Sequence, residues 1–177
     1  MYDPLSSSIL GPSDKPALTL QLQPQQVEAL VSESQFMAIV GGMRGGKSVT
    51  GLYLAFLSMV RNPGYRVFYI IPSYKKADII IEAFNLILGR WCVERRAADK
   101  RYKLINGSEL RIFSAAPGSE ESFLGYECDL FMLEEFREMQ SGDPPGSKVF
   151  DNAYSRVVST GGRVVIVSSP ETGWGNV

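Results

Sequence analysis

An apolar run that breaks into glycines constrains this chain more than any other stretch. Residues 36–48 read FMAIVGGMRGGKS, and the second half fits the pattern G-x-x-x-x-G-K-[ST] at Gly41, Gly46, Lys47 and Ser48. Glycine at such places lets backbone N–H groups come close to a polyphosphate. The pattern predicts a buried strand, a phosphate-binding loop and a helix. The alternative interpretation is a glycine-rich turn without a ligand.

Each part of this loop has an expected task. The side chain of Lys47 would reach the β- and γ-phosphates, and the hydroxyl of Ser48 would be a ligand of Mg²⁺. A helix over residues 49–60 would point its positive N-terminal end at the anion. The nucleotide-binding residues expected around the phosphates are Gly41, Gly42, Met43, Arg44, Gly45, Gly46, Lys47, Ser48 and Val49.

Length and composition limit the class of protein. A chain of 177 residues suits one domain, which we place at residues 19–177 after a Ser- and Pro-rich arm or linker at residues 1–18. The net charge of −1 argues against a general nucleic-acid coat, so any DNA contact would be local. Without histidine, and with Cys92 and Cys128 far apart, the common zinc patterns are excluded, and we expect both thiols to be buried. No secretory or membrane-spanning segment is indicated, which favours the cytoplasm.

Alternating strand and helix patterns predict an α/β fold. Residues 65–71 have the continuous apolar character of a strand buried in a parallel sheet. A helix over residues 73–88 follows, with Ser73 as N-cap and Gly89 as stop. Asn106-Gly107, between two alternating runs, predicts an antiparallel hairpin insert. A helix over residues 148–158 and a strand over residues 163–167 complete the pattern.

A second stretch carries nucleotide chemistry. Residues 128–135 read CDLFMLEE, a buried type of strand that runs into two carboxylates. Glu134 could hold Mg²⁺ through a water, and Glu135 could polarise the attacking water, which favours hydrolysis over transfer to a small acceptor. The alternative is a plain strand end.

Two further groups of residues have weaker signals. Gln26, ahead of the loop strand, has the donor and the acceptor that one edge of adenine requires, or it is a solvated residue of a helix that starts near Pro24. A basic cluster near Trp91 could meet a phosphate backbone or form a solvated face. It comprises Arg95, Arg96, Lys100, Arg101 and Lys103.

The last third of the chain adds candidates for regulation of hydrolysis. Arg137 and Arg156 are candidate arginine fingers, although surface arginines are far commoner than fingers. Ser168, Ser169 and Pro170 turn out of the final strand at the end where ligands of open α/β sheets bind, and their hydroxyls could sense the γ-phosphate.

With these residues in place, the chain resembles the N-terminal ATPase domain of large terminase subunits, the DNA-packaging motors of tailed bacteriophages and herpesviruses. Gln26 in LQPQQ looks like the family's adenine-binding motif, GGMRGGKS like its arginine-bearing Walker A loop, MLEE like its Walker B strand with the catalytic glutamate, and SSP like its coupling motif. The match covers roughly residues 20–172.

The resemblance implies a P-loop NTPase fold of the additional-strand catalytic-glutamate type, with a mainly parallel sheet flanked by helices. It implies ATP and Mg²⁺ as cofactors, catalytic roles for Glu135, Lys47 and Arg44, metal binding by Ser48 and Glu134, and coupling by residues 168–170. Two positions depart from the family. Glu134 stands where members usually carry Asp, and Arg44 lies three residues before Lys47 where many members have it four before.

The implied partners are double-stranded DNA, a portal protein and a small terminase subunit, in the cytoplasm of an infected cell rather than in the virion. A homo-oligomeric ring is expected when the motor is active, and the isolated chain could be a monomer. Family members usually continue into a nuclease domain; we expect neither that domain nor nuclease activity in this chain. Two alternatives stay open: a helicase-type nucleic-acid translocase, and a nucleotide-gated assembly module with negligible turnover.

Overall fold

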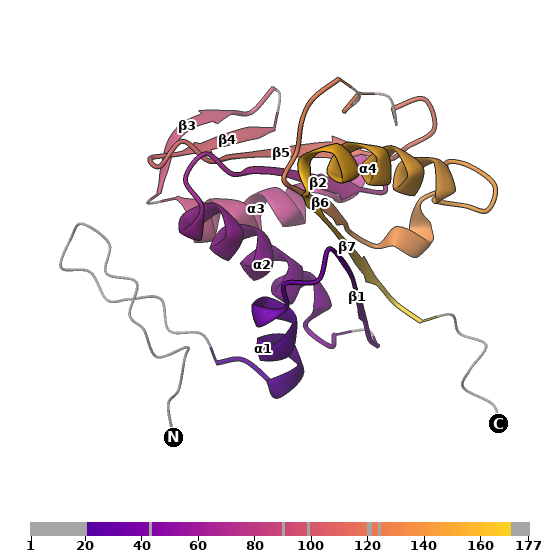
Figure 1. Cartoon of the computed structure of the whole chain (residues 1–177), viewed down its shortest axis with the longest axis horizontal. Coiled ribbons are helices and arrows are strands. Elements are labelled where there is room, and N and C mark those ends of the chain that lie inside the picture. Colours follow the sequence, from indigo (N-terminus) through magenta and orange to yellow (C-terminus); the bar gives the residue numbers. More distant parts are fainter. Residues whose placement is uncertain are drawn as a thin grey trace.

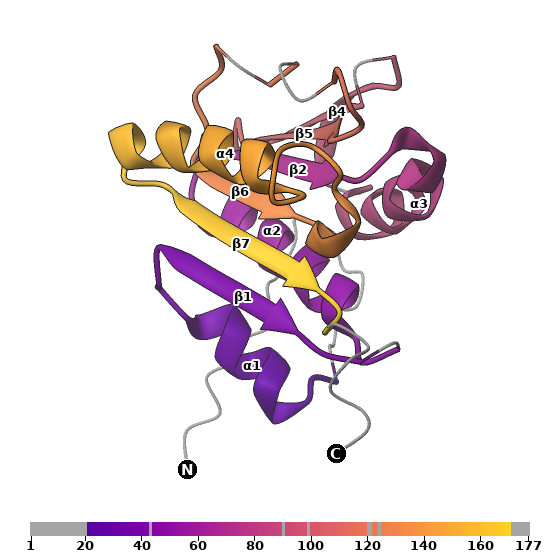
Figure 2. The same cartoon turned by 90° about the vertical axis from the view of Figure 1, so that its right-hand side faces the viewer.

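The computed structural model describes residues 21–170 except residues 43, 90, 99, 120, 121 and 124. The arm expected at residues 1–18, Met43 and residues 171–177 lie outside the described residues. The rest forms one sheet with helices on both faces (Figures 1 and 2). The elements are α1 Pro24–Val31, β1 Phe36–Val40, α2 Lys47–Arg61, β2 Arg66–Ile71, η1 Tyr74–Lys76, α3 Ala77–Leu88, β3 Cys92–Arg96, β4 Arg101–Leu104, β5 Glu109–Ser114, β6 Leu130–Leu133, η2 Phe136–Glu138, α4 Ser147–Thr160 and β7 Arg163–Ser168.

The seven-stranded sheet has the order β1-β7-β6-β2-β5-β4-β3. Neighbours from β1 to β5 run parallel, whereas β5–β4 and β4–β3 are antiparallel. Parallel strands present their carboxyl ends along one edge of a sheet, where ligands of open α/β folds bind. The segments that follow β1, β6 and β7 therefore meet there, although they are far apart in sequence. The expected mainly parallel α/β sheet is confirmed.

Burial varies across the sheet as this order requires. The central strand β6 is buried at every position, and β2 is buried at all but its first residue. Both have continuous apolar sequences because helices cover them on both faces. In contrast, β1 lies at an edge, and its residues alternate between exposed and half-buried. Phe36 and Val40 at its ends are 43% and 58% exposed.

Two apolar cores hold the layers together. One lies between the sheet and α1, α2 and α3, and the other lies between the sheet and α4. Helix α2 lies close to the sheet at Gly51, where an added Cβ would lie 3.0 Å from Met132 Cε and 3.2 Å from Val167 Cγ2. Because Gly51 has no side chain, helix α2 can pack this close to strands β6 and β7.

The hairpin insert forms where the sequence predicts it. Gly107 has a φ of 84°, and its N–H donates to Leu104 O at 3.0 Å. The Asn106 side chain donates to Met59 O at 2.7 Å, which ties the turn to the end of α2. Strand β3 was not expected as a strand. An edge strand can carry charge on its open side. The charged sequence of β3 therefore lacks the apolar alternation that would predict a strand.

Helix boundaries differ only slightly from those expected. Helix α2 begins at Lys47, directly after Gly46, and α4 begins at Ser147. Ser73 precedes the short turn η1 rather than α3 itself, and its side chain makes no capping hydrogen bond. Within the described ranges, no helix combines the length and the apolarity needed to cross a membrane.

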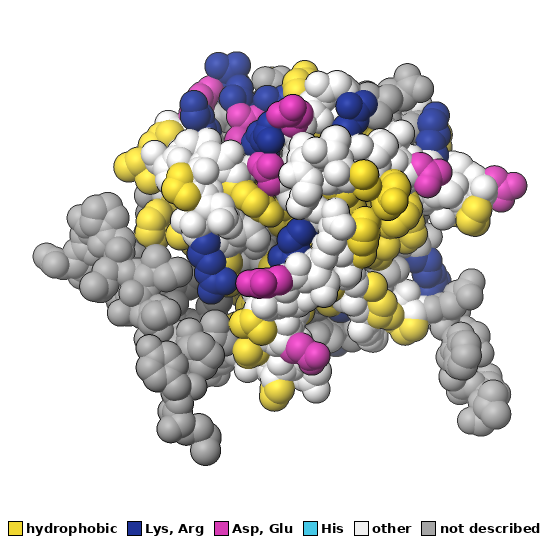
Figure 3. Space-filling model, viewed as in Figure 1, with side chains coloured by type: hydrophobic (Ala, Val, Ile, Leu, Met, Phe, Trp, Pro, Cys, Tyr) yellow, Lys and Arg dark blue, Asp and Glu magenta, His cyan; other side chains and the backbone are white. Residues whose placement is uncertain are grey.

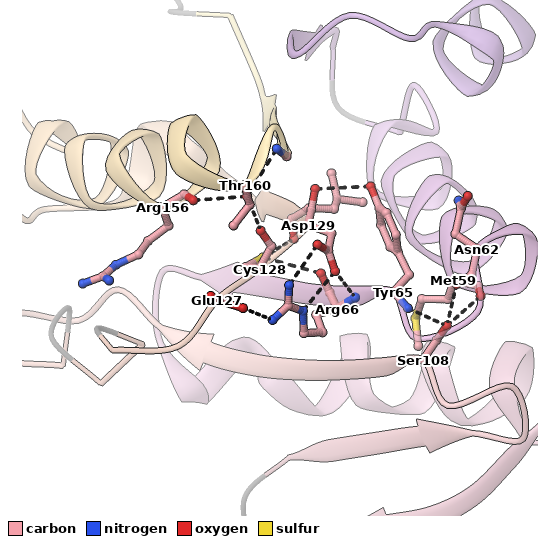
Figure 4. A network of polar contacts seen from close by, with 12 residues as sticks. Met59, Asn62, Tyr65, Arg66, Ser108, Glu127, Cys128, Asp129, Arg156 and Thr160 are labelled. Atoms are coloured by element: carbon pink, nitrogen blue, oxygen red, sulfur yellow. Dashed lines mark hydrogen bonds and ion pairs between the residues drawn. The ribbon is translucent and has the colours of Figure 1, made fainter.

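A polar network closes the edge where the strands begin (Figure 4). Arg66 donates through its backbone N–H and its guanidinium to both carboxylate oxygens of Asp129, at 2.8 to 3.1 Å, and to Glu127 at 2.7 Å. These hydrogen bonds, first of all those to Asp129, raise the pKa of Arg66. The Thr160 hydroxyl donates to Cys128 O at 3.1 Å and joins the end of α4 to the start of β6. The network lies away from the edge at which the glycine loop lies.

Candidate nucleotide-binding site

The glycine loop connects the end of β1 to the start of α2. Gly46 is the N-cap of α2 and has a φ of 76°, a conformation that a side chain would strain. An added Cβ on Gly45 would lie 3.1 Å from Gly42 O, so the loop folds tightly on itself. Arg44, between these glycines, also has a positive φ of 62°. The first backbone N–H groups of α2 have no partners within the helix and lie where an anion would be wrapped.

Lys47 lies along this loop. Its ammonium donates to Gly42 O at 2.9 Å. An added Cβ on Gly41 would contact the Lys47 stem at 3.6 Å, so the chain passes directly over the first glycine. The cation is thus held beside the backbone that is predicted to enclose the phosphates.

The acidic strand end meets this loop through Glu134. The Ser48 hydroxyl donates to Glu134 Oε1 at 2.5 Å, across 86 residues of sequence. The other carboxylate oxygen, Oε2, accepts a hydrogen bond from the Tyr69 hydroxyl at 2.6 Å. Glu134 is 3% exposed and Tyr69 is fully buried. Residues of helix α2 and strand β2 therefore meet at one carboxylate, which follows the end of β6.

The surroundings of Glu134 oppose its charge. Burial raises the pKa of Glu134 above its ordinary value, against the hydrogen bonds from Ser48 and Tyr69, which lower it. The nearby Glu135 adds to the rise and Lys47 reduces it. Burial, followed by the charge of Glu134, raises the pKa of Tyr69 as well, so its hydroxyl stays a donor. Burial favours the protonated form of Glu134, whereas a divalent cation at this carboxylate would favour the ionised form.

The donor set fits a hard cation such as magnesium. Ser48 and Glu134 offer a hydroxyl and a carboxylate, and Mg²⁺ takes oxygen ligands. In the described part of the chain, no group of three or more His, Cys, Asp or Glu side chains could hold a metal ion. Mg²⁺ is commonly held by one or two protein groups together with waters and phosphate oxygens. The pair therefore suits a metal that arrives with a nucleotide.

Glu135 has an unusual backbone. Its φ of 47° and ψ of 46° place it in the left-handed region, where it begins the short turn η2. Such a conformation costs a residue other than glycine roughly 1–2 kcal/mol, and strain of this kind often occurs at functional sites. The turn separates two neighbouring acids, since Glu134 is buried and Glu135 is half-exposed.

Solved structures share this architecture. The chain is similar to the large terminase ATPase domain of Thermus phage P74-26, with a TM-score of 0.70 and 20% identity, over 85% of this chain and 66% of that chain. It is also similar to the large terminase of a thermophilic bacteriophage, with a TM-score of 0.64 and 14% identity, over 85% of this chain and 40% of that one. No family model and no curated protein sequence matches.

The chain has the fold of a phage large terminase ATPase domain. It spans 66% of the Thermus phage domain and 40% of the thermophilic bacteriophage protein, so the match covers part of the length of each. At such low identity the likeness concerns the terminase fold alone. The roles of individual residues have to be argued from the geometry.

Within this terminase fold, Gln26 bridges two helices. Its side-chain amide donates to Thr50 Oγ1 at 3.1 Å and to Gly46 O at 3.4 Å, and its carbonyl oxygen accepts from the N–H of Gln23 at 2.9 Å. It is half-buried, so it is not simply a solvated helix residue. Adenine recognition stays a prediction, and it would require Gln26 to exchange some of these contacts.

The two finger candidates lie at opposite edges of the sheet. Arg137 is in η2, two residues after Glu135, and its guanidinium donates to Pro170 O at 2.8 Å. Arg156 is in α4, one turn before Thr160, at the edge shown in Figure 4. Within one chain, Arg137 thus lies at the nucleotide edge and Arg156 does not. Ser168 is also at that edge, where its carbonyl accepts the N–H of Gly41 at 3.4 Å.

Two of the five residues of the basic cluster form ion pairs with acids of the insert. Arg96 pairs with Glu94, and Arg101 pairs with Glu109. Lys100 lies 4.2 Å from the centre of the Tyr74 ring, and Arg95 lies 5.9 Å from that of Tyr102. Figure 3 shows basic and acidic side chains intermingled over β3–β5. This arrangement favours the solvated face over a phosphate-binding patch.

Sequence reasoning missed Tyr69. It lies inside the apolar run of β2, where the expected role of each residue is packing. One signal was present, since a buried tyrosine hydroxyl requires a hydrogen-bond partner.

Proposed function

We propose that the chain is the ATPase motor domain of a viral large terminase, which hydrolyses ATP with Mg²⁺ to move double-stranded DNA into a procapsid. One observation carries the proposal: the 2.5 Å contact between the Ser48 hydroxyl and the Glu134 carboxylate at the glycine loop. The terminase fold supports it. The large terminase of the thermophilic bacteriophage has been crystallised with ATP-γ-S and with ADP, in forms that match this chain with TM-scores of 0.59 and 0.58.

The proposed reaction assigns one task to each group. The loop backbone and Lys47 bind the phosphates, with Arg44 adding positive charge near them. Ser48 and Glu134 would hold Mg²⁺, which when bound would neutralise charge on the phosphate oxygens. Glu135 accepts a proton from the water that attacks the γ-phosphorus, while the bond from that phosphorus to ADP breaks. Gln26 would recognise adenine.

The motor role extends beyond these residues. Ser168, Ser169 and Pro170 would couple hydrolysis to movement, in a ring of copies that acts with a portal protein and a small terminase subunit. Arg156 and Arg137 are the candidates for a finger that reaches a neighbour's nucleotide. The site of action would be the cytoplasm of the infected cell.

Glu135→Gln tests the chemical step. We expect the variant to bind Mg·ATP in calorimetry with a Kd within about twofold of wild type, because the amide keeps the shape of the side chain. Phosphate release in long single-turnover assays should fall by about 10² to 10⁴, the usual contribution of a general base. Glu127→Gln, at the opposite edge, is the matched control and should hydrolyse ATP normally. Wild-type turnover in Glu135→Gln would contradict the assignment.

A further inference from the structure

Arg137 is joined to the end of β7 by two contacts. Its guanidinium donates to Pro170 O at 2.8 Å, and its backbone N–H donates to Ser168 Oγ at 3.4 Å. Both contacts are made within one chain. A finger would need its guanidinium free to reach a neighbouring nucleotide, whereas this one is bound to the main chain of its own subunit.

The segment that Arg137 holds also contacts the glycine loop. Ser168 lies opposite Val40 in the parallel pairing of β7 with β1. Its carbonyl then accepts the N–H of Gly41, the first glycine of the loop, at 3.4 Å. Residues 168–170 therefore lie between the start of the phosphate-binding loop and the turn that follows Glu135.

The turn itself is supported on its other side. A Cβ added to Gly146 would lie 2.9 Å from Phe136 Cζ, so the ring packs directly against the start of α4. Gly146 has a φ of 85° and is the N-cap of α4. Residues 136–138 are thus confined between α4 and β7. A shift of either element would change the position of Glu135.

We propose that Arg137 is a positioning residue that fixes residues 168–170 to the turn bearing Glu135, and so keeps the proposed base in register with the glycine loop of its own subunit. This inference rests on the proposed ATPase function. It assigns to Arg137 a role within one subunit in place of a finger that acts on a neighbour.

Arg137→Ala is the first test, with Arg61→Ala at the exposed end of α2 as the matched control. We expect kcat for ATP hydrolysis to fall about tenfold while the Kd for Mg·ATP stays within about twofold, because Arg137 does not contact the nucleotide. Arg137→Lys should recover part of the rate, since an ammonium can still donate to Pro170 O. A wild-type kcat in Arg137→Ala would overturn the proposal, and so would an equal loss of nucleotide affinity.

Subunit mixing separates the two roles of the arginine. Glu135→Gln and Arg137→Ala chains are combined under conditions in which the wild-type chain assembles and hydrolyses ATP. A finger would be supplied to the Arg137→Ala subunit by its Glu135→Gln neighbour, so activity would rise above that of either variant alone. A positioning residue cannot be replaced from outside, so we expect no rise. Recovery in the mixture would overturn the proposal.

Hydrogen exchange tests the contact without any turnover. In Arg137→Ala, amides in the segment around Ser168 and Ser169 should exchange at least about fivefold faster than in wild type, while those of β6 stay unchanged. If wild type shows no ATPase activity, the proposed function fails, but this measurement still decides whether Arg137 holds the segment. Unchanged exchange there would overturn the contact itself.

Discussion

Tyr69→Phe is the most informative single substitution in the site. The Tyr69 hydroxyl donates to Glu134 Oε2 at 2.6 Å, and both residues are buried. Phenylalanine keeps the ring that lies 5.2 Å from the centre of Phe84, so no cavity forms. The loss of a hydrogen bond to a charged group costs about 1.5–3 kcal/mol. In a domain of this size, each kcal/mol shifts Tm by roughly 2–4 °C, so we expect Tm to fall by about 3–12 °C.

The expected loss depends on pH in a defined direction. Burial raises the pKa of Glu134, so ionising this carboxylate reduces stability as pH rises through its folded-state pKa. The Tyr69 hydroxyl favours the ionised form and limits that reduction. Without it, the pKa of Glu134 rises further, and the variant loses more stability at high pH. The difference between variant and wild type should therefore be largest at pH 8 and should narrow toward pH 5.

Urea denaturation at both pH values measures this difference. Tyr154→Phe is the control, because the Tyr154 side chain is 48% exposed and its change should cost less than about 0.5 kcal/mol. The Mg²⁺ concentration for half-maximal ATP hydrolysis should also rise, by about 10- to 100-fold if Tyr69 orients a metal ligand. A Tyr69→Phe protein as stable as wild type at pH 8, or one with the same deficit at both pH values, would refute the reasoning.

Two further predictions concern the core. Burial raises the pKa of the Cys128 thiol to about 12, so Cys128 should not react with Ellman's reagent at pH 8 in the native protein, whereas the half-buried Cys92 should. Two rapidly reacting thiols before urea is added would contradict this. Gly51→Val should destabilise the protein by about 1–3 kcal/mol, since the new side chain would meet Met132 and Val167 at the contact of α2 with the sheet. An unchanged urea midpoint would show that α2 can move away at little cost.

The nucleotide edge could be predicted from sequence because each part of it has a local signal. Glycines with a lysine and a serine at fixed spacing indicate the loop, and a buried strand that runs into Glu134 indicates its partner. The meeting of Ser48 with Glu134 then follows from the rule that parallel strands end at one edge of a sheet. The parallel α/β part of the fold and the hairpin at Asn106-Gly107 were predicted for the same reason, whereas strand β3 was not.

The features that sequence reasoning missed depend on which elements become neighbours. Arg137 was one of two candidate fingers or an ordinary surface arginine, and its contact with Pro170 depends on the placement of β7 beside η2. The basic cluster could be a phosphate surface or, as the sequence favoured, a solvated face, and the pairing of Arg101 and Arg111 with Glu109 that bears on this depends on the register of β4 on β5. Charge in a sequence does not reveal which charges will be neutralised.

The edge position of β1 has a mechanical consequence for the loop that it carries. Among the described strands, β1 pairs only with β7, whereas β6 has a neighbour on each side. Peptide groups on the open side of β1 lack a ladder partner in this part of the chain, and local opening costs least where pairing is one-sided. The strand that precedes the phosphate loop is therefore easier to displace than strand β6, which precedes Glu134. Small displacements at the loop can occur while the carboxylate stays in place.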